Sequence, residues 1–215
     1  MICALVLAAG RSHRMGAQKL LLPLGGKPAI ARIVDEVVRR PVDQVFVVVG
    51  HDGKRIAGAL AGRRVTFVTN PHAQGEMLSS VRCGLSAMPT SCTAVLAVLG
   101  DQPSLTADVV GLLIRAFRTG GRGIVVPTYG GRRGHPLLFA MHYRDEVLSR
   151  HEDVGLRGLL HAHPEDVLEV ETAAPGVLED MNVPEDFRQT AARFADGTDG
   201  SESRGRSRNG RMQRP

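Results

Sequence analysis

The chain has 215 residues, of which 43% are hydrophobic and 23% are charged, and its formal net charge at pH 7 is +5. This length and composition fit one globular α/β domain better than two. No apolar run approaches the roughly 18 residues that cross a bilayer, which excludes a transmembrane helix. We also expect no membrane partner.

The amino-terminal segment and the cysteines both bear on the cellular compartment. Residues 1–7 have no basic stretch ahead of their apolar run, which is atypical of a secretory signal. The cysteines at 3, 83 and 92 form no Cys-x-x-Cys pair, and their odd number favours reduced thiols. We therefore expect a cytoplasmic protein.

Part of the positive charge lies in residues 195–215, where five arginines stand against three acids. That segment contributes +2, which leaves +3 for residues 1–194, so the charge does not predict a specific nucleic-acid partner. The segment is also nearly devoid of apolar residues and cannot offset the entropy of ordering its chain. We expect one domain over 1–194 and a disordered basic tail over 195–215. A weak electrostatic contact of this tail with an acidic partner or RNA is the alternative.

The predicted elements alternate along the chain. Residues 2–8 form a continuous apolar run, typical of a strand buried on both faces. Apolar residues at helical spacing follow over 30–38, and Pro41 ends that helix. Strands are predicted over 44–50 and 64–69, and a helix over 77–88. A fourth strand covers 93–100, Thr106 is a helix N-cap, and a fifth strand covers 123–127.

Strands that alternate with helices predict right-handed crossovers. The expected fold is therefore α/β, a three-layer α/β/α sandwich with a mostly parallel sheet. Ligands on such sheets bind at the carboxyl ends of the strands. The polar residues that follow each strand are thus the candidates for function.

The first strand leads into a loop that is rich in small and basic residues. Gly10 and Gly16 permit a sharp turn and a close approach of backbone N–H groups to a ligand. Arg14 and Lys19 add the positive charge that a polyphosphate needs. The spacing matches neither the Walker nor the dinucleotide-binding loop. A phosphate-binding loop and an ordinary glycine-rich turn both remain open on this evidence.

The fourth strand ends in Gly100 and Asp101, followed by Gln102-Pro103. A carboxylate at the tip of a buried strand is costly unless it meets a cation or hydrogen-bond donors. Mg²⁺ suits this position because it takes hard oxygen ligands and retains waters and substrate phosphates. Asp101 is therefore a metal-ligand candidate, and a turn or N-cap aspartate is the alternative.

Other chemistries lack support in the sequence. His161 and His163 have no third ligand at metal-binding spacing, and no His-Glu-x-x-His motif is present. No Gly-x-Ser-x-Gly motif is present either, which leaves a hydrolase triad without a nucleophile elbow.

The whole string LAAGRSHRMGAQKLLLPLGGKP, residues 7–28, is more specific than its parts. It resembles the opening signature of nucleotidyltransferases that make molybdenum cofactor dinucleotides and sugar nucleotides, and within them the molybdenum cofactor cytidylyltransferases. Ala9 stands where the guanylyltransferase relatives usually carry glycine. The resemblance extends through most of residues 1–194. It implies the nucleotide-diphospho-sugar transferase-like fold, with an antiparallel addition over 135–170.

Four further segments carry the resemblance. Gly100-Asp101-Gln102-Pro103 matches the family's Gly-Asp-x-Pro metal motif, which makes Asp101 the leading metal-ligand candidate. Asn70-Pro71 is followed by Met77, Ser80 and Gly84, with a motif glycine at 75, one position early, and Glu76 in its usual place. Gly134-His135-Pro136 matches a segment that faces the acceptor in the family. Residues 179–186 resemble the closing motif, with Asn182 where many cytidylyl members have aspartate. A weaker match covers residues 153–157.

The resemblance implies roles for the matched residues. Arg14, Lys19 and Asp101 are the expected catalytic residues, and Asp101 with Asn182 or Asp180 the expected Mg²⁺ ligands. Gly134, His135 and Pro136 are expected to contact the acceptor. The expected nucleotide-binding residues are Leu7, Ala8, Ala9, Gly10, Arg14, Gly16, Lys19, Asn70, Ser80 and Gly100.

The implied reaction transfers CMP from CTP to the terminal phosphate of the molybdenum-pterin cofactor, with release of pyrophosphate. A molybdoenzyme that receives the product is then an expected partner. A sugar-phosphate uridylyltransferase or a guanylyltransferase is the nearer alternative. An oxidoreductase or accessory protein on the same scaffold is the more distant one, because fold alone does not fix function.

Overall fold

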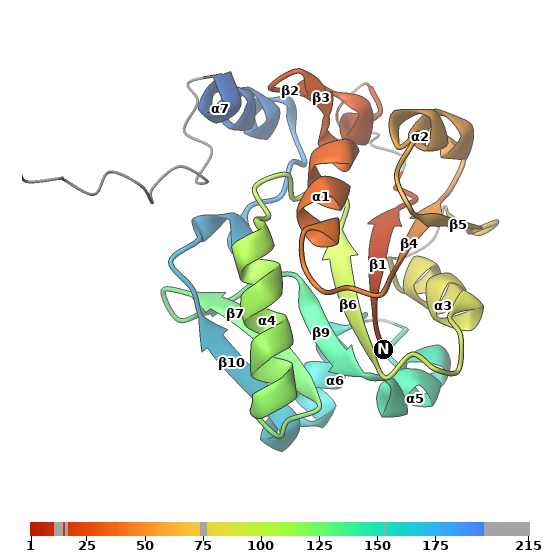
Figure 1. Ribbon diagram of the computed structural model, residues 1–215, viewed down its shortest axis with the longest axis vertical. Helices are drawn as coiled ribbons and strands as arrows, with labels where there is room; N and C mark the ends of the chain where they lie inside the picture. The colour runs from red at the N-terminus through yellow and green to blue at the C-terminus, as the bar shows by residue number, and fades with distance from the viewer. Residues whose placement is uncertain (11–14, 16, 74–76, 153, 196–215) are drawn as a thin grey trace, which may run out of the picture.

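A mostly parallel sheet forms the centre of the protein, and helices cover both of its faces (Figure 1). The computed structural model describes residues 1–10, 15, 17–73, 77–152 and 154–195. The strands of the main sheet are β1 (Ile2–Ala8), β4 (Gln44–Val49), β5 (Thr66–Thr69), β6 (Ala94–Leu99), β7 (Ile124–Tyr129), β8 (Arg132–Arg133), β9 (Leu137–Ala140) and β10 (Val167–Glu171). Within the described residues these eight strands run in the order β10-β7-β9-β6-β1-β4-β5, and β8 pairs with β7.

The pairing directions bring four loops to one edge of the sheet. β1 lies parallel to β4 and β6, and β5 continues this parallel set beyond β4. β9 runs antiparallel between β6 and β7, whereas β10 is parallel to β7. The carboxyl ends of β1, β4, β5 and β6 therefore meet at the same edge, where ligands bind in folds of this kind.

Two apolar cores lie on the two faces of the sheet. The helices are α1 (Ala29–Val38), α2 (Gly53–Ala59), α3 (Met77–Ala87), α4 (Ala107–Thr119), α5 (Arg144–Ser149), α6 (Arg157–Ala162) and α7 (Pro184–Ala195). Helices α1, α2 and α4 contribute to one core, and α3, α5 and α6 contribute to the other. The protein is thus a three-layer α/β/α sandwich, as the sequence predicts.

Helix α7 docks outside this sandwich. A small apolar cluster joins Phe187 and Phe194 of α7 to Leu24 and Met181. Leu24 belongs to a short hairpin of β2 (Pro23–Leu24) and β3 (Lys27–Pro28), and Figure 1 shows α7 beside this hairpin. Among the helices of the described residues, none has the length and apolar character needed to span a membrane.

Most of the predicted elements are confirmed, with boundaries that shift by a few residues. Thr106 caps α4, since its hydroxyl accepts a hydrogen bond from the Val109 amide at 3.4 Å. Strand β9 provides the antiparallel addition expected over 135–170. β10, at the end of the same range, pairs parallel to β7, and because β9 is antiparallel to β7, β10 runs opposite to β9. The tail expected over 195–215 lies outside the described residues except for Ala195, which ends α7.

Gly84 shows why one motif residue must be small. It lies on α3 at the point where this helix crosses β1 and β4, and it is buried. A Cβ atom at Gly84 would overlap the Leu5 side chain and come within 3.0 Å of Val48 Cγ2. The glycine therefore sets how closely α3 packs on the sheet, which in turn fixes the start of α3 near the carboxyl edge.

We expect Gly84→Ala to lower the free energy of unfolding by about 1–3 kcal/mol, because the added methyl overpacks the core. Gly58→Ala in α2 is the matched control, since a Cβ atom added there would have open space for 4 Å among the described residues. That variant should gain about 0.4–1 kcal/mol from reduced chain entropy in the unfolded state. Denaturant unfolding of both variants checks the pair, and equal effects would contradict this account of Gly84.

Candidate functional site

The ends of β1 and β6 approach each other closely at the carboxyl edge of the sheet. The Gly100 amide donates a hydrogen bond to the Leu7 carbonyl at 3.0 Å. A Cβ atom at Gly100 would fall 2.5 Å from that carbonyl oxygen, so only glycine fits. Asp101 follows directly and is thereby held beside the loop that leaves β1.

A cluster of three polar side chains lies at this point. The Lys19 ammonium is 2.6 Å from Asp101 Oδ2 and 3.0 Å from Asn182 Oδ1. The Lys19 side chain is only 13% exposed and that of Asp101 is 22% exposed. We call Lys19, Asp101 and Asn182 the cation cluster. Charge-assisted hydrogen bonds in so sheltered a place are stronger than at an open surface.

The chain holds Asn182 in this place through its backbone and its neighbours. The Met181 amide donates to the Asp101 carbonyl at 2.9 Å, which ties the two segments together. The Asn182 amide donates to Asp186 Oδ2 at 2.8 Å. The Asn182 side-chain nitrogen donates to Asp180 Oδ2 at 2.6 Å, so its oxygen is left to face Lys19. Asp180 therefore orients Asn182, and it is Asn182 that contributes an oxygen to the cluster.

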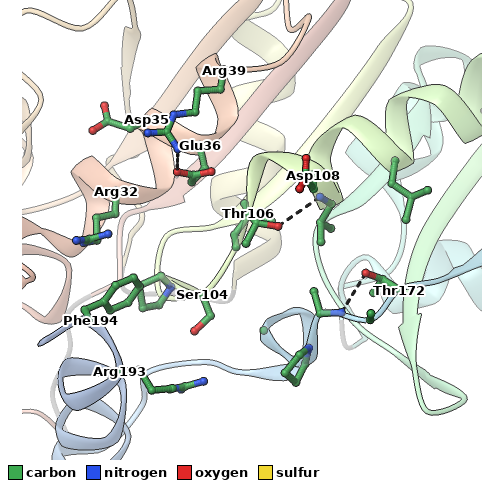
Figure 2. A pocket seen from close by; sticks show the side chains of 18 of the residues that line it. Arg32, Asp35, Glu36, Arg39, Ser104, Thr106, Asp108, Thr172, Arg193 and Phe194 are labelled. Atoms are coloured by element: carbon green, nitrogen blue, oxygen red, sulfur yellow. Dashed lines mark hydrogen bonds and ion pairs between the residues drawn. The ribbon is translucent and has the colours of Figure 1, made fainter. Parts of the chain in front are cut away.

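A groove of about 690 Å³ between α1, α4 and α7 lies next to this region (Figure 2). Its charged side chains largely contact one another. The Arg39 guanidinium pairs with Glu36, Arg193 pairs with Glu179 at 2.8 Å, and Arg32 stacks over the Phe194 ring at 4.1 Å. The Arg32–Phe194 contact joins α1 to α7 across this groove. We infer that the contacts around the groove hold α7 against the sandwich and so help to keep Asn182 in place.

The cation cluster fits a divalent metal by the chemistry of its donors. Asp101 Oδ2 and Asn182 Oδ1 both lie within hydrogen-bond distance of one cationic atom, Lys19 Nζ. Two such hard oxygens suit Mg²⁺, which retains waters and substrate phosphates as its other ligands. The described part of the chain contains no group of three or more His, Cys, Asp or Glu side chains arranged to hold a metal ion.

Asn70 joins the end of β5 to the start of α3. Its side-chain nitrogen donates to the hydroxyls of Ser79 and Ser80, both at 3.0 Å, and its oxygen accepts from the His72 amide at 2.9 Å. The side chain is thus nearly buried, with 4% of the residue exposed. Both amide hydrogens are engaged within the protein, so the geometry gives Asn70 and Ser80 a loop-holding role. Contact with a base remains a prediction.

Sequence reasoning missed Gln18 and Asp52. The Gln18 amide donates to the Gly10 carbonyl at 3.2 Å and to Asp52 Oδ2 at 2.9 Å. The hydrogen bond from Gln18, followed by one from Arg55, lowers the pKa of Asp52 below its usual value. Asp52 follows β4, so the rule that polar residues after strands are candidates would have found it.

The predicted acceptor segment lines a second cavity, of about 710 Å³. Gly134 and His135 are fixed by backbone hydrogen bonds to Pro127 and Val177, each at 2.8 Å. Burial, and then the positive charge of Arg157, lower the pKa of His135 and keep its ring neutral at pH 7. Pro136 follows in the same loop, but the lining includes His135 and Gly134 rather than Pro136.

Two neighbours of the cation cluster line this cavity. One is Gln102, which follows Asp101 in the chain, and the other is Asp180, which accepts a hydrogen bond from the Asn182 side chain. Its cationic lining comes from Arg132, Arg133 and Arg157. The Arg133 guanidinium is paired with Glu169 at 2.7 Å, so an anion in the cavity would meet the charges of Arg132 and Arg157.

The remaining predicted residues divide into two groups. Leu7, Ala8 and Ala9 lie at the carboxyl end of β1 or just beyond it, and Gly10 is exposed. Arg14 and Gly16 lie outside the described residues, and so do the motif positions 75, 76 and 153. The structure thus brings Lys19, Asp101 and Asn182 together, while the roles assigned to Arg14 and Gly16 stay predictions.

Comparisons with known proteins identify the family to which the chain is similar. A family model described as a MobA-like NTP transferase domain matches residues 4–167. Molybdenum cofactor cytidylyltransferase of Escherichia coli is 26% identical over 200 residues, which cover 91% of this chain and 98% of that protein. The bifunctional protein GlmU of Mycolicibacterium paratuberculosis is 36% identical over 133 residues, 58% of this chain. That match spans only 27% of GlmU.

Two solved structures are similar over nearly the whole chain. A nucleotidyl transferase from Methanothermobacter superposes with a TM-score of 0.80 and 28% identity, over 92% of this chain and 99% of that one. Rv0371C of Mycobacterium tuberculosis, solved in complex with manganese, has a TM-score of 0.73 and 25% identity, over 89% and 98% of the two chains.

We expect Asn70→Ala to lower the free energy of unfolding by about 1–3 kcal/mol, because it leaves buried polar groups without partners. Gln189→Ala, on the exposed face of α7, is the control and should change stability by less than about 0.5 kcal/mol. Thermal or denaturant unfolding checks both. A stability loss at Asn70 no larger than at Gln189 would show that the Asn70 network contributes nothing.

Proposed function

Because the chain belongs to the MobA-like NTP transferase family and is a nucleotidyltransferase, we propose that it transfers CMP from CTP to the terminal phosphate of a molybdenum-pterin cofactor. The observation that carries the proposal is the cation cluster at the carboxyl edge of the sheet, next to an arginine-lined cavity. A triphosphate and an anionic acceptor both need cationic groups at this edge.

The reaction joins two anions, so positioning and charge neutralisation are its main requirements. An oxygen of the acceptor phosphate attacks the α-phosphorus of CTP. The bond from that phosphorus to the bridging oxygen of the β-phosphate breaks, and pyrophosphate leaves with the electron pair. The attacking phosphate is already anionic, so no strong general base is needed.

Each member of the cation cluster has a role in this proposal. Asp101 and Asn182 would hold Mg²⁺, which when bound neutralises charge on the phosphates. Lys19 neutralises negative charge as pyrophosphate departs, an electrostatic contribution commonly worth several kcal/mol. Arg14 acts with Lys19 by the family resemblance. The manganese complex of Rv0371C supports a divalent metal in this family.

The arginine-lined cavity is the proposed acceptor site. Its volume of about 710 Å³ lies in the range of small-molecule pockets. Leu137, Leu156 and Leu160 supply an apolar wall for a ring system, and Arg157 supplies positive charge for a phosphate. Neutral His135 adds a hydrogen-bonding group without a charge. The product would then pass to a molybdoenzyme partner.

The alternative is a sugar-nucleotide reaction, favoured by the 36% identity to GlmU. The share of this chain that each match covers argues against the sugar-nucleotide alternative. The GlmU match covers 58% of this chain, whereas the molybdenum cofactor cytidylyltransferase match covers 91%. A relative that matches nearly the whole chain is the better guide to the acceptor, because the proposed acceptor site draws its residues from distant parts of the sequence.

We expect Asp101→Ala to abolish metal-dependent turnover while the protein stays folded, because it removes the carboxylate of the cation cluster. Asp145→Asn is the control, since that side chain is 93% exposed on α5, and it should keep full activity. Pyrophosphate release with CTP, acceptor and Mg²⁺ measures turnover, and circular dichroism checks the fold. Near-normal turnover by Asp101→Ala would refute the metal-ligand role.

The second expectation concerns the donor base. Ala9 follows β1 and is 7% exposed, and we propose that its methyl narrows the space available to a base beside the loop backbone. We expect CTP to be preferred over GTP, because extra bulk penalises a purine more than a pyrimidine. Ala9→Gly should loosen the preference only in part, since other groups also contact the base.

Turnover with each triphosphate and the pterin acceptor tests this, in the wild type, in Ala9→Gly and in Ala61→Gly, an exposed-position control. The control should keep the wild-type ratio of CTP to GTP use. Equal or better use of GTP by the wild type would refute the cytidylyl assignment and leave the broader nucleotidyltransferase activity.

A further inference from the structure

One wall of the proposed acceptor cavity comes from a single short stretch of chain, residues 154–161. Its cavity-lining members are Val154, Leu156, Arg157, Leu160 and His161. The stretch contains a turn and most of α6, and it belongs to none of the strands. Leu156 and Leu160 pack into the core on that face of the sheet, and polar contacts outside the sheet add to this hold on the wall.

One carboxylate contacts both ends of the wall. Glu146 of α5 accepts through Oε1 from His151 Nε2 and through Oε2 from His163 Nε2, each at 2.8 Å. His151 precedes the wall and His163 follows it. The Glu146 side chain is 19% exposed, so the two hydrogen bonds are largely sheltered from water. Burial alone would raise the pKa of Glu146, but the hydrogen bonds from His163 and His151 hold it below its usual value.

The His151 residue that contacts Glu146 has an unusual backbone conformation. Its φ is 71°, in the left-handed region that a non-glycine residue rarely occupies. Its carbonyl accepts hydrogen bonds from the amides of Gly155 at 2.8 Å and Val154 at 3.3 Å. A strained residue of this kind persists when its surroundings fix it, and here the surroundings are Glu146 and α6.

The ring of His151 also packs on α6 itself. A Cβ atom at Gly158 would fall 2.6 Å from His151 Cγ, so the glycine leaves the space that the ring fills. The imidazole is therefore held between Glu146 on one side and the wall on the other. A shift of Glu146 would be transmitted to α6 through this contact.

Helix α5 is in turn fixed to α3. Arg82 Nε donates to the Val147 carbonyl at 2.9 Å, and its Nη2 donates to the Arg150 carbonyl and to Glu152, both at 2.7 Å. Val147 is fully buried in the core on that face. Glu146 thus lies on a helix that is itself fixed to the core. A side chain can position its neighbours only if its own backbone is held in place.

Glu146 does not line the cavity, so it has no direct route to a bound acceptor. Arg157 does line it, together with the partly buried His135, and the positive charge of Arg157 helps to lower the pKa of that histidine. We propose that Glu146 is a positioning residue: by clamping His151 and His163 it fixes residues 154–161, and with them Arg157, in the place that the anionic acceptor requires. The identity of the acceptor rests on the function proposed above, but the clamp does not.

The test is Glu146→Gln, which keeps the size of the side chain but loses its charge and can accept from only one histidine, so the other ring must change tautomer to accept from the new NH₂ group. Hydrogen exchange without any substrate should be about tenfold or more faster across residues 154–162. Exchange in α3 should stay unchanged. Glu165→Gln is the matched control, because that side chain is 72% exposed and lies 4.0 Å from His163 Nδ1.

The second readout is kinetic, with CTP and the molybdenum-pterin cofactor as substrates. Glu146→Gln should raise the KM for the pterin about tenfold while the KM for CTP and kcat stay within about twofold, since a displaced wall weakens acceptor binding alone. Gly158→Ala should give the same split by an independent route, which keeps the test informative if Glu146→Gln fails to fold.

Unchanged exchange over 154–162 would overturn the clamp, and faster exchange with an unchanged pterin KM would overturn its positioning role. A rise in both KM values together with a fall in kcat would also overturn the positioning role, because such a pattern indicates general destabilisation. If the wild type does not use the pterin at all, the function proposed above fails, and the exchange measurement still decides the clamp.

Discussion

The site depends on bringing two side-chain oxygens from distant parts of the sequence to one ammonium group, that of Lys19. Lys19 Nζ lies 2.6 Å from Asp101 and 3.0 Å from Asn182, although Asn182 stands 163 residues further along the chain than Lys19. Partly buried charges are costly unless they are paired. Every element that forms the carboxyl edge of the sheet therefore has to be placed accurately enough to satisfy this cluster.

The scaffold meets that demand by close packing at a few small residues and by docking α7. Gly100 lets the end of β6 reach the backbone of β1, and Gly84 lets α3 settle on the same strands. The apolar contacts of Phe187 and Phe194 hold α7 beside the β2–β3 hairpin, so that Asn182, two residues before this helix, stays opposite Asp101. The proposed acceptor side is built differently, from a wall without strand pairing whose two flanking histidines contact Glu146.

The sequence predicts the sandwich and the central strands well, because apolar runs and helical spacing are local signals. It also predicts Asp101 and Lys19, since both follow directly on a strand or a glycine-rich loop. It could not distinguish Asp180 from Asn182, because that depends on which atom of a hydrogen-bonded pair faces Lys19. It also missed Glu146, because the contacts of this residue with His151 and His163 form only in the folded structure and follow no sequence motif.

The most direct test of the account is Mn²⁺ binding followed by electron paramagnetic resonance, with and without CTP, in the wild type and in Asp101→Asn. The account predicts one Mn²⁺ per chain in the presence of CTP and an affinity at least about tenfold weaker in the variant, equivalent to about 1.4 kcal/mol. Asp145→Asn should bind as the wild type does. Equal Mn²⁺ affinity in Asp101→Asn and the wild type would contradict the assignment of the cation cluster as the metal-dependent centre.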